Sequence, residues 1–450
     1  MKSGKIKSKF IQNDIRFNAG FFLNSDAFNS RIVEIKKDNC FPLEKVSTVW
    51  NPPIFKRQFC SPSERAVQYC QSSDVTNALE GSEVYINKIQ AIKIGCIVKE
   101  KQILVTGFGT IGNTRLVNEL SSGISYANNV CRITVNDDIP YGFIYAFLTS
   151  KYGKSQLNKN ASGSVVRYIE APGIKKTLVP ILPEATQQKI HNLIVDASNL
   201  RVEANKLLKE AVDLFEGEID YSASEKIYKV KINNLTNHHQ RLDATYNADW
   251  FDSFYENLSR KKIKLATIAD LSLKVFTPGI FKRVRTQNSE LGIPFLSGSD
   301  LLNSLPKFDI FLSKKMKKID DYILKDGWLA IQDAGTIGYI SYINKYLDGV
   351  SATNNLIRVI PKTSDNYNPY IFTFFKTKTG QQILKNFEFG SVQKHIDNYQ
   401  ISTLRIPIFD HIFSEVITKV SEAMEMFGNA CFKEKTAINL IEKEIDLWQQ

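Results

Sequence analysis

The chain has 450 residues, which is enough for two or three domains of ordinary size. Hydrophobic residues make up 43% of it and charged residues 23%, a composition that excludes a disordered or fibrous protein. The 58 Lys and Arg residues outnumber the 47 Asp and Glu residues, and the formal net charge of +11 favours a polyanionic partner, nucleic acid ahead of a membrane surface.

The start of the chain and its cysteines indicate where the protein works. Residues 1–10 are rich in lysine, but no apolar segment of a signal peptide follows them. The longest apolar stretch, around residues 143–148, is far too short to span a membrane. The six cysteines are too sparse for a disulfide framework in a chain this long, and they form no Cys-x-x-Cys pair of the kind that binds zinc. We therefore expect a cytoplasmic protein without a metal.

The chain contains an internal repeat with a nearly constant spacing. Gly109-Thr110-Ile111-Gly112 recurs as Gly335-Thr336-Ile337-Gly338, and the difference between 335 and 109 is 226. Ile54-Phe55-Lys56-Arg57 recurs at the same offset as Ile280-Phe281-Lys282-Arg283. After one inserted residue, Gly163-Ser164-Val165 recurs as Gly390-Ser391-Val392. A single register over most of the chain indicates a duplicated unit.

Each copy begins with a globular part, over 16–182 and 241–409. Short β-like runs alternate there with glycine-rich turns and short helical patches, which predicts two compact α+β domains. The clearest of the runs are 103–106, 130–135 and 177–181. In this division of the chain, residues 1–15 are an N-terminal extension and residues 223–240 are a linker.

Each copy ends with a segment, 183–222 or 410–450, that has helical periodicity. Apolar residues recur three and four positions apart, as the a and d positions of a coiled coil do. The first stripe is Ile190, Leu193, Ala197, Leu200, Ala204, Leu207, Ala211 and Leu214. The second, which Glu434 interrupts, is Val416, Val420, Ala423, Phe427, Ala430, Ile438, Ile441 and Ile445. We interpret both as seams for a partner helix; the alternative is that each helix packs only on its own domain.

The duplication predicts how these parts combine. If the two helices pair antiparallel through their seams, the globular domains lie at opposite ends of an internal two-fold arrangement. The predicted fold class is therefore α+β, with two domains related by internal duplication and separated by two long antiparallel coiled-coil helices. A helix of about 34 residues is roughly 50 Å long at ~1.5 Å per residue. Basic domains at its two ends would contact DNA about one helical turn or more apart.

Asn51-Pro52-Pro53-Ile54 resembles the Asn-Pro-Pro-aromatic motif of DNA adenine-N6 methyltransferases, in which the aromatic ring stacks on a flipped base. Ile54 offers no such ring. The second copy reads Thr277-Pro278-Gly279-Ile280 and lacks the asparagine. Because both copies share only a turn followed by a basic segment, we favour a structural role and keep a methyltransferase as an alternative.

The string 107–112 fits the GxGxxG pattern of dinucleotide sites. Such a site needs a helix that opens at the glycines, whereas residues 113–117 look like a strand, and Asp333 replaces the first glycine in the second copy. We therefore favour a tight β-turn. The histidines show no metal-ligand spacing, and no P-loop or GxSxG motif is present. Nothing in the sequence requires a catalytic site or a cofactor in this chain.

Cations follow a proline or glycine turn in both copies, where long side chains can reach phosphates or base edges. Polar residues of the repeated glycine turns accompany them. A solvated charged face is the alternative for any one of these residues, but their recurrence favours a working surface. The candidate DNA-binding residues are Lys56, Arg57, Thr110, Asn113, Ser164, Arg167, Lys282, Arg283, Arg285, Thr336, Ser391 and Lys394.

The pattern resembles the specificity subunit of type I restriction-modification systems over nearly the whole chain. Its most specific elements are Arg241-Leu242-Asp243-Ala244, the paired Gly-Thr-Ile-Gly and Asn-Asn strings, and residues 180–190, which are similar to the family's Pro-x-x-x-Gln-Gln-x-Ile entry into a conserved helix. The chain departs from the pattern at Phe17-Asn18, where Leu-Asp is expected. It departs again at 413–416, where Phe-Ser-Glu-Val stands in place of Gln-Gln-x-Ile.

By this resemblance, 16–182 and 241–409 are target-recognition domains that each read one half of a bipartite DNA sequence. The helices in 183–222 and 410–450 dock two methyltransferase (modification) subunits, which hold S-adenosylmethionine. Motor-nuclease (restriction) subunits use ATP and Mg, and this chain is a non-catalytic reader without a cofactor. Two alternatives stay open: a DNA adenine-N6 methyltransferase, and a scaffold subunit that does not read DNA.

Overall fold

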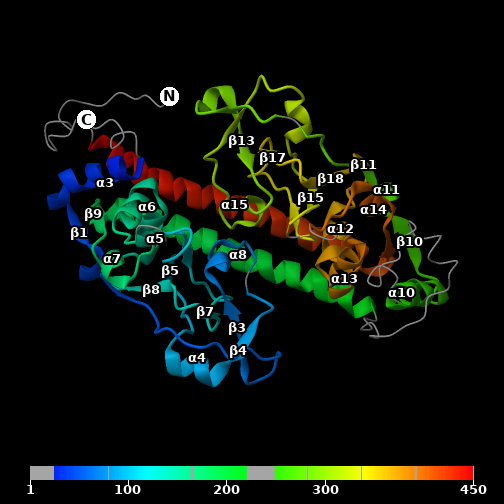
Figure 1. The fold of residues 1–450 in the computed structure, drawn as a ribbon, viewed down its shortest axis with the longest axis horizontal. Helices are drawn as coiled ribbons and strands as arrows, with labels where there is room; N and C mark the ends of the chain where they lie inside the picture. The colour runs from blue at the N-terminus through cyan, green and yellow to red at the C-terminus, as the bar shows by residue number, and fades with distance from the viewer. Residues whose placement is uncertain are drawn as a thin grey trace. The chain divides into compact units, whose positions relative to one another are not determined.

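The structure is a computed structural model of the chain. It describes residues 25–79, 81–163, 167–219, 249–280, 282–335, 337–390 and 393–448. They form two compact units (Figure 1): unit 1 within Met1–Val202 and Ala430–Gln450, and unit 2 within Glu203–Asn429. The expected extension 1–15 and linker 223–240 lie outside the described residues, as do Ser164, Thr336 and Ser391.

Unit 1 mixes short helices with short strands. Its helices are α3 (Ser25–Ile35), η1 (Lys37–Asn39), η2 (Leu43–Lys45), η3 (Ser72–Thr76), α4 (Lys88–Ile94), α5 (Tyr141–Thr149), α6 (Lys151–Lys159) and α7 (Ala171–Lys175). Its strands are β1 (Cys40–Pro42), β2 (Ser47–Trp50), β3 (Ala66–Cys70), β4 (Tyr85–Asn87), β5 (Ile103–Thr106), β6 (Thr114–Leu116), β7 (Ser125–Tyr126), β8 (Val130–Val135) and β9 (Leu178–Pro180). The strands expected at 103–106, 130–135 and 177–181 are thus present as β5, β8 and β9.

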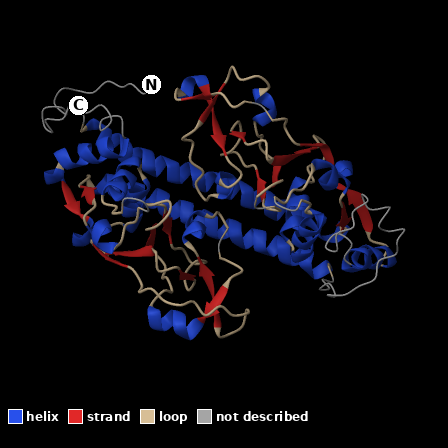
Figure 2. Ribbon diagram, viewed as in Figure 1, coloured by secondary structure: helices blue, strands red, loops and turns tan. Residues whose placement is uncertain are grey.

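The strands of unit 1 form three small sheets. The largest has the order β2-β8-β5-β6 and is antiparallel throughout, with Ile103 of β5 opposite Ile133 of β8. A second sheet, β4-β3-β7, contains the parallel pair β3 and β7, and β1 pairs with β9. Figure 2 shows the same mixture of helices and strands in both units, which confirms the α+β class.

Unit 2 has helices at α10 (Asp249–Arg260), α11 (Ile268–Leu271), η4 (Ser289–Leu291), η5 (Asp300–Leu302), η6 (Ile319–Tyr322), α12 (Asn368–Lys376), α13 (Lys378–Phe387) and α14 (Asn398–Thr403). Its strands are β10 (Lys264–Thr267), β11 (Ser272–Phe276), β12 (Arg285–Thr286), β13 (Gly292–Leu296), β14 (Phe311–Ser313), β15 (Leu329–Gln332), β16 (Ile340–Tyr342), β17 (Ser351–Ala352), β18 (Leu356–Pro361) and β19 (Arg405–Ile408). They form the sheets β11-β18-β15-β16, β12-β14-β13-β17 and β10-β19. The first of these has the same order as β2-β8-β5-β6 in unit 1, and β13 and β17 are parallel as β3 and β7 are.

Two long helices contribute to both units. The helix α8 spans Glu184–Glu218, and α15 spans Asp410–Leu447. In unit 2 they run antiparallel, because Glu210 meets Lys419 at 2.7 Å while Glu218, eight residues later, meets His411 at 2.8 Å. In unit 1, Asp196 of α8 forms an ion pair with Lys433 of α15 at 2.9 Å.

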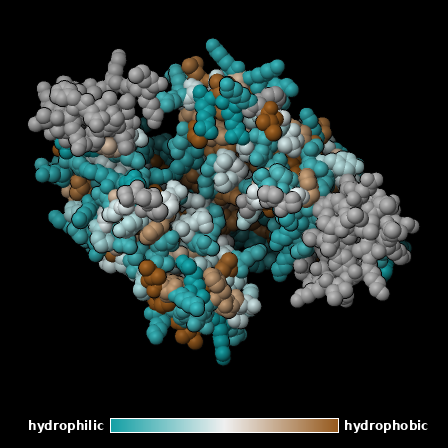
Figure 3. Space-filling view, viewed as in Figure 1, coloured by the Kyte–Doolittle hydropathy of each residue, from teal (hydrophilic) through white to brown (hydrophobic). Residues whose placement is uncertain are grey.

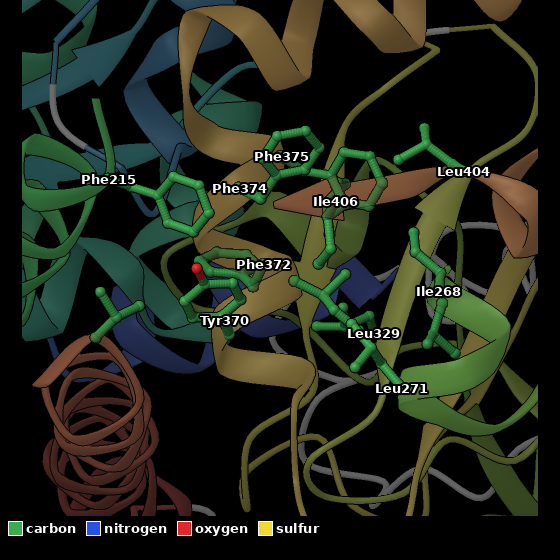
Figure 4. Close-up of a cluster of buried hydrophobic side chains, with 14 of the residues drawn as sticks. Phe215, Ile268, Leu271, Leu329, Tyr370, Phe372, Phe374, Phe375, Leu404 and Ile406 are labelled. Carbon is green, nitrogen blue, oxygen red and sulfur yellow. The ribbon is translucent and has the colours of Figure 1, made fainter. Parts of the chain in front are cut away.

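Each unit has its own hydrophobic core, which includes part of both long helices. In unit 1, Ile190 of α8 and Ile441 of α15 belong to the core that contains β5 and α5. In unit 2, the core contains Phe215, Tyr370 and Phe374 (Figure 4). The ring centre of Phe215 lies 4.8 Å from that of Tyr370 and 5.7 Å from that of Phe374. The long helices therefore pack on the globular parts as well as on each other.

The apolar stripe expected on α8 is present, but half of the residues predicted for it are not its buried ones. Ile190, Ala197, Ala204 and Ala211 are buried, whereas Leu193, Leu200, Leu207 and Leu214 are only half-buried. The side chains buried in place of three of these leucines are Ile194, Leu208 and Phe215. Since steps of three and four residues both fit a helix, the sequence does not decide which residue of each adjacent apolar pair faces the core. On α15 the expected residues Val416, Val420, Ala423, Phe427, Ala430, Ile438, Ile441 and Ile445 are all buried.

Candidate nucleic-acid interface

The basic loop of unit 1 joins β2 to β3 and carries Lys56 and Arg57, both exposed. Gln90 of α4 anchors the loop, because its side-chain amide donates to the carbonyl of Lys56 at 2.9 Å and accepts from the main-chain N–H of Gln58 at 3.1 Å. The guanidinium of Arg57 donates to the hydroxyl of Tyr69 and lies 5.4 Å from the centre of its ring. The side chain of Gln90 thus fixes the loop, and both cations remain exposed.

Unit 2 repeats this arrangement at the matching positions. Arg283 lies 5.2 Å from the ring centre of Phe295, and the difference between 283 and 57 equals that between 295 and 69. Its guanidinium also donates to the side chains of Thr353, at 3.1 Å, and Asn354, at 2.9 Å. Lys282 and Arg285 are exposed on either side of it. A guanidinium has five N–H donors, so an arginine oriented in this way keeps donors for a phosphate or a base.

The Gly-Thr-Ile-Gly string forms a tight turn. Gly109 and Gly112 have φ of 73° and 77°, in the left-handed region that glycine adopts readily. Thr106 closes the turn, since its hydroxyl donates to the carbonyl of Thr110 at 2.5 Å and accepts from the N–H of Asn113 at 3.0 Å. The side chain of Thr110 is exposed and that of Asn113 half-buried. Strand β6 follows directly, so no helix opens at these glycines to hold the phosphates of a dinucleotide.

The glycine turn near residue 163 lies against the first turn in unit 1, and unit 2 matches it. Tyr168 forms bridges with both Phe108 and Ser162, and His395 forms bridges with both Ala334 and Phe389. The rings of Phe108 and Tyr168 stack at 5.3 Å. These bridges bring the described residues beside the Gly-Ser-Val string to the residue that precedes the Gly-Thr-Ile-Gly string in each unit.

Two of the predicted cations bind their own unit. The guanidinium of Arg167 donates to the carbonyl of Asn158, at the end of α6. Lys394 forms an ion pair with Glu388 at 3.3 Å. Both side chains are exposed, so they can still contribute charge, but a DNA phosphate would compete with these partners.

Buried arginines at matching positions support the loops beneath the candidate surface. Arg132 of β8 and Arg358 of β18 are completely buried. Arg132 donates to the main-chain carbonyls of Ala127 at 2.9 Å and Tyr126 at 2.6 Å, and Arg358 to that of Thr353 at 3.1 Å. Burial lowers the pKa of each guanidinium to about 10. The repeated Asn-Asn strings follow the carbonyls that these arginines hold, a role that sequence reasoning missed because a polar position in a strand is usually exposed.

The side chain of Asn51, the polar residue of the methyltransferase-like string, forms hydrogen bonds with main-chain groups of its own unit. Its side-chain amide donates to the carbonyl of Asn128 at 3.2 Å and accepts from the N–H of Ala171 at 2.9 Å. A group engaged on both sides is not positioned to hold a target base. The structure therefore favours the structural interpretation of this string.

A second group of cations was not among the predicted residues. Lys314, Lys315, Lys317 and Lys318 are all exposed in the segment between β14 and η6 of unit 2. Four lysines within five residues are a visible signal of a phosphate-binding segment. The repeat concealed it, because unit 1 has the mostly apolar helix α4 at the matching place.

The described part of the chain contains no cluster of metal ligands and no helix that could span a membrane. Within it, no three His, Cys, Asp or Glu side chains gather as the ligands of a metal ion would. None of its helices combines the length and the apolar character needed to cross a bilayer.

The comparisons with known proteins agree with the predicted family over part of the chain. The S subunit of a type I restriction-modification system from M. genitalium is similar at 13% identity, with a TM-score of 0.31 over 91% of this chain and 92% of that one. The HsdS subunit from Thermoanaerobacter tengcongensis is similar at 12% identity, with a TM-score of 0.28 over 90% of this chain and 95% of that one. TM-scores this low carry no weight here. No curated protein matches the chain. Residues 261–409 match the family model of the type I restriction modification DNA specificity domain, so the resemblance predicted from the sequence is confirmed for that segment.

Proposed function

We propose that the chain is the DNA-specificity subunit of a type I restriction-modification complex and reads a bipartite DNA sequence. The observation that carries this proposal is the family match over 261–409, which covers most of the globular part of unit 2. Unit 1 has sheets of the same strand order, which supports a second recognition domain that arose by duplication. One domain would read each half of the target.

The repeated basic loops supply the contacts with DNA in this proposal. Lys56 and Lys282 are exposed, and Arg57 and Arg283 are oriented by an aromatic ring at matching positions. Phosphate contacts from these residues would set the register of each domain, and neighbouring polar side chains would reach base edges. The long helices α8 and α15 would dock the modification subunits. Their exposed faces carry many charged residues, which suits a polar interface.

We propose that the chemistry belongs to the partners. The modification subunits would hold S-adenosylmethionine, the restriction subunits would use ATP and Mg, and this chain would hold no cofactor. A methyltransferase remains the alternative function, although the engagement of Asn51 by the main chain disfavours it. Methyl transfer from labelled S-adenosylmethionine to DNA by the purified chain alone would support that alternative.

The test is an exchange of one domain at a time. The chain is expressed with modification subunits, and the bound sequence is selected from a random DNA pool. Replacing residues 16–182 by the matching domain of a relative should change one half of the selected sequence and leave the other half intact. Replacing 241–409 should change only the other half. Selection of no defined sequence by the wild-type complex would support the scaffold alternative, and a simultaneous change of both halves would exclude independent domains.

A further inference from the structure

Two isoleucines are far more exposed than is usual for apolar side chains. Ile54 is 89% exposed and Ile280 is 86% exposed, and among the exposed large hydrophobic residues of the described chain the next value is 70%. Single exposed apolar residues are common on protein surfaces. These two occupy matching positions of the repeat, since the difference between 280 and 54 is the offset of 226. Chance exposure does not explain the same extreme at both positions.

The local structure holds each isoleucine outward. In unit 1, Pro52 is buried and Phe55 packs against the core, so Ile54 lies at the tip of a loop that is anchored on both sides. In unit 2, Pro278 is buried, and the buried Tyr322 donates to the carbonyl of Gly279 at 2.9 Å. Ile280 follows directly. The prolines fix φ, and a β-branched side chain has few χ1 rotamers, so each isoleucine side chain has few conformations to choose from.

The charges beside these tips indicate the partner. Lys56 and Arg57 follow Ile54, and Lys282 and Arg283 follow Ile280, all of them exposed. An exposed apolar side chain next to cations matches the way in which some DNA-binding proteins insert Ile, Leu or Phe between base pairs while cations hold the adjacent phosphates. The visible face in Figure 3 has its brown side chains in small groups among teal ones.

We propose that Ile54 and Ile280 are apolar wedges, each of which enters the base stack of one half of the bound DNA and unstacks one base step. The inference rests on the proposed function, because it requires specific DNA binding. It adds a sequence-independent step to that function: both domains would distort DNA in the same way, whatever bases each of them reads. Flexible steps such as TA and CA would then be preferred at the wedge positions, although no side chain reads their edges.

The experiment uses the full chain with modification subunits and duplexes of the selected sequence. The fluorescent base 2-aminopurine replaces one adenine at a time in each half, and its emission rises where a base is unstacked. The wild-type complex should show one such rise in each half. Ile54→Ala should abolish the rise in one half and leave the other, and Ile280→Ala should do the reverse. Each substitution should weaken binding about tenfold, equivalent to about 1.4 kcal/mol.

Controls separate a wedge from other roles. Ile181→Ala in unit 1 and Leu273→Ala in unit 2 remove similar side chains that are 53% and 65% exposed, and they should change neither signal. Ile54→Phe should keep the rise, because a larger wedge still unstacks the step. Since Ile54 and Ile280 are exposed, their substitution should leave folding unchanged within about 0.5 kcal/mol, a value that thermal unfolding checks.

Four results would overturn the wedge. A wild-type complex that binds its sequence without any rise in emission excludes unstacking and leaves the proposed function standing. Loss of affinity on replacing thymine by uracil, without a rise, would instead assign the isoleucines to thymine methyl groups. Loss of subunit assembly in Ile54→Ala, with DNA contacts unaffected, would assign them to a protein interface. If the wild-type complex selects no sequence at all, the proposed function fails and the wedge fails with it.

Discussion

Glu434 interrupts the apolar stripe of α15 and has two polar partners. Removing its cationic partner should lower the stability of unit 1 strongly. Its carboxylate is only 1% exposed and lies 2.5 Å from the guanidinium of Arg201 on α8. The hydroxyl of Tyr145, from α5, donates to the same carboxylate at 2.6 Å. Burial acts to lower the pKa of Arg201, but Glu434, Cys431 and Tyr145 together outweigh it, and the net shift is upward. Three elements of unit 1 thus meet at one buried charge.

Arg201→Met tests this arrangement. The substitution keeps the volume near the helix pair but leaves the carboxylate of Glu434 buried without its cation. Breaking a buried pair on one side costs about 3–5 kcal/mol, because the remaining charge has lost its compensation. Replacing both residues, by Arg201→Met with Glu434→Leu, removes that charge as well. The double variant should therefore be more stable than the single one, with a residual cost of about 1–3 kcal/mol for the hydroxyl of Tyr145 that loses its acceptor.

Hydrogen exchange measures these changes segment by segment, which suits a chain of two units that need not unfold together. Amides in 184–202 and 430–447 should lose protection in Arg201→Met and recover much of it in the double variant. Lys209→Met is the matched control, since Lys209 lies on the same helix, is 76% exposed and pairs with Asp213 four residues away. It should cost less than about 1 kcal/mol.

The outcome that refutes the reasoning is specific. If Arg201→Met lowers the stability of unit 1 no more than Lys209→Met does, the charge of Glu434 does not depend on Arg201 for its compensation. If the double variant is less stable than Arg201→Met, the pair contributes net attraction that the burial of two charges does not cancel.

Other substitutions test the loops, the packing and the half-buried Lys376. Lys56→Ala and Lys282→Ala should each weaken DNA binding at all sequences and reduce the slope of log affinity against log salt by about one. Gly380→Ala should lower the free energy of opening of α12 and α13, measured by hydrogen exchange, by about 1–3 kcal/mol, because its Cβ would lie 2.1 Å from a main-chain carbonyl oxygen. Gly217→Ala is the control, since the space around Gly217 is open, and it should leave stability unchanged or raise it. Burial lowers the pKa of Lys376 from 10.5 to about 8, so the unfolded state binds more protons between these values and stability should rise with pH there. Lys376→Met should stabilise unit 2 at pH 7 by on the order of 2 kcal/mol. Thermal unfolding of this variant should no longer show stability that rises with pH between 8 and 10.5.

Local patterns were sufficient to predict several elements. The runs 103–106 and 130–135 coincide with β5 and β8, because a short apolar run bounded by polar turn residues has few other conformations in a mixed domain. The glycines of 109–112 form the expected turn, since two of them adopt positive φ. The long helical segments became α8 and α15 for the same local reason, a continuous helical period without breakers.

Long-range partners could not be predicted in this way. Glu434 looked like an interruption because its cation, Arg201, is 233 residues away in the chain, the difference between 434 and 201. No local pattern marks Arg132 and Arg358 as buried, although each is buried and donates to main-chain carbonyls of neighbouring loops. In each case the charge is tolerated only because of contacts that the tertiary fold supplies.

The same limit applies to the candidate interface, and it affects cations and apolar residues differently. A surface cation is expected on any soluble domain, and Arg167 and Lys394 prove to bind groups of their own unit. Recurrence of a charge is therefore weak evidence for a partner outside the chain. An apolar side chain exposed at the tip of an anchored loop gains nothing within its own unit, because water surrounds most of it. Ile54 and Ile280 thus point to a binding partner more directly than the predicted cations do, and their exposure became evident only in the folded chain.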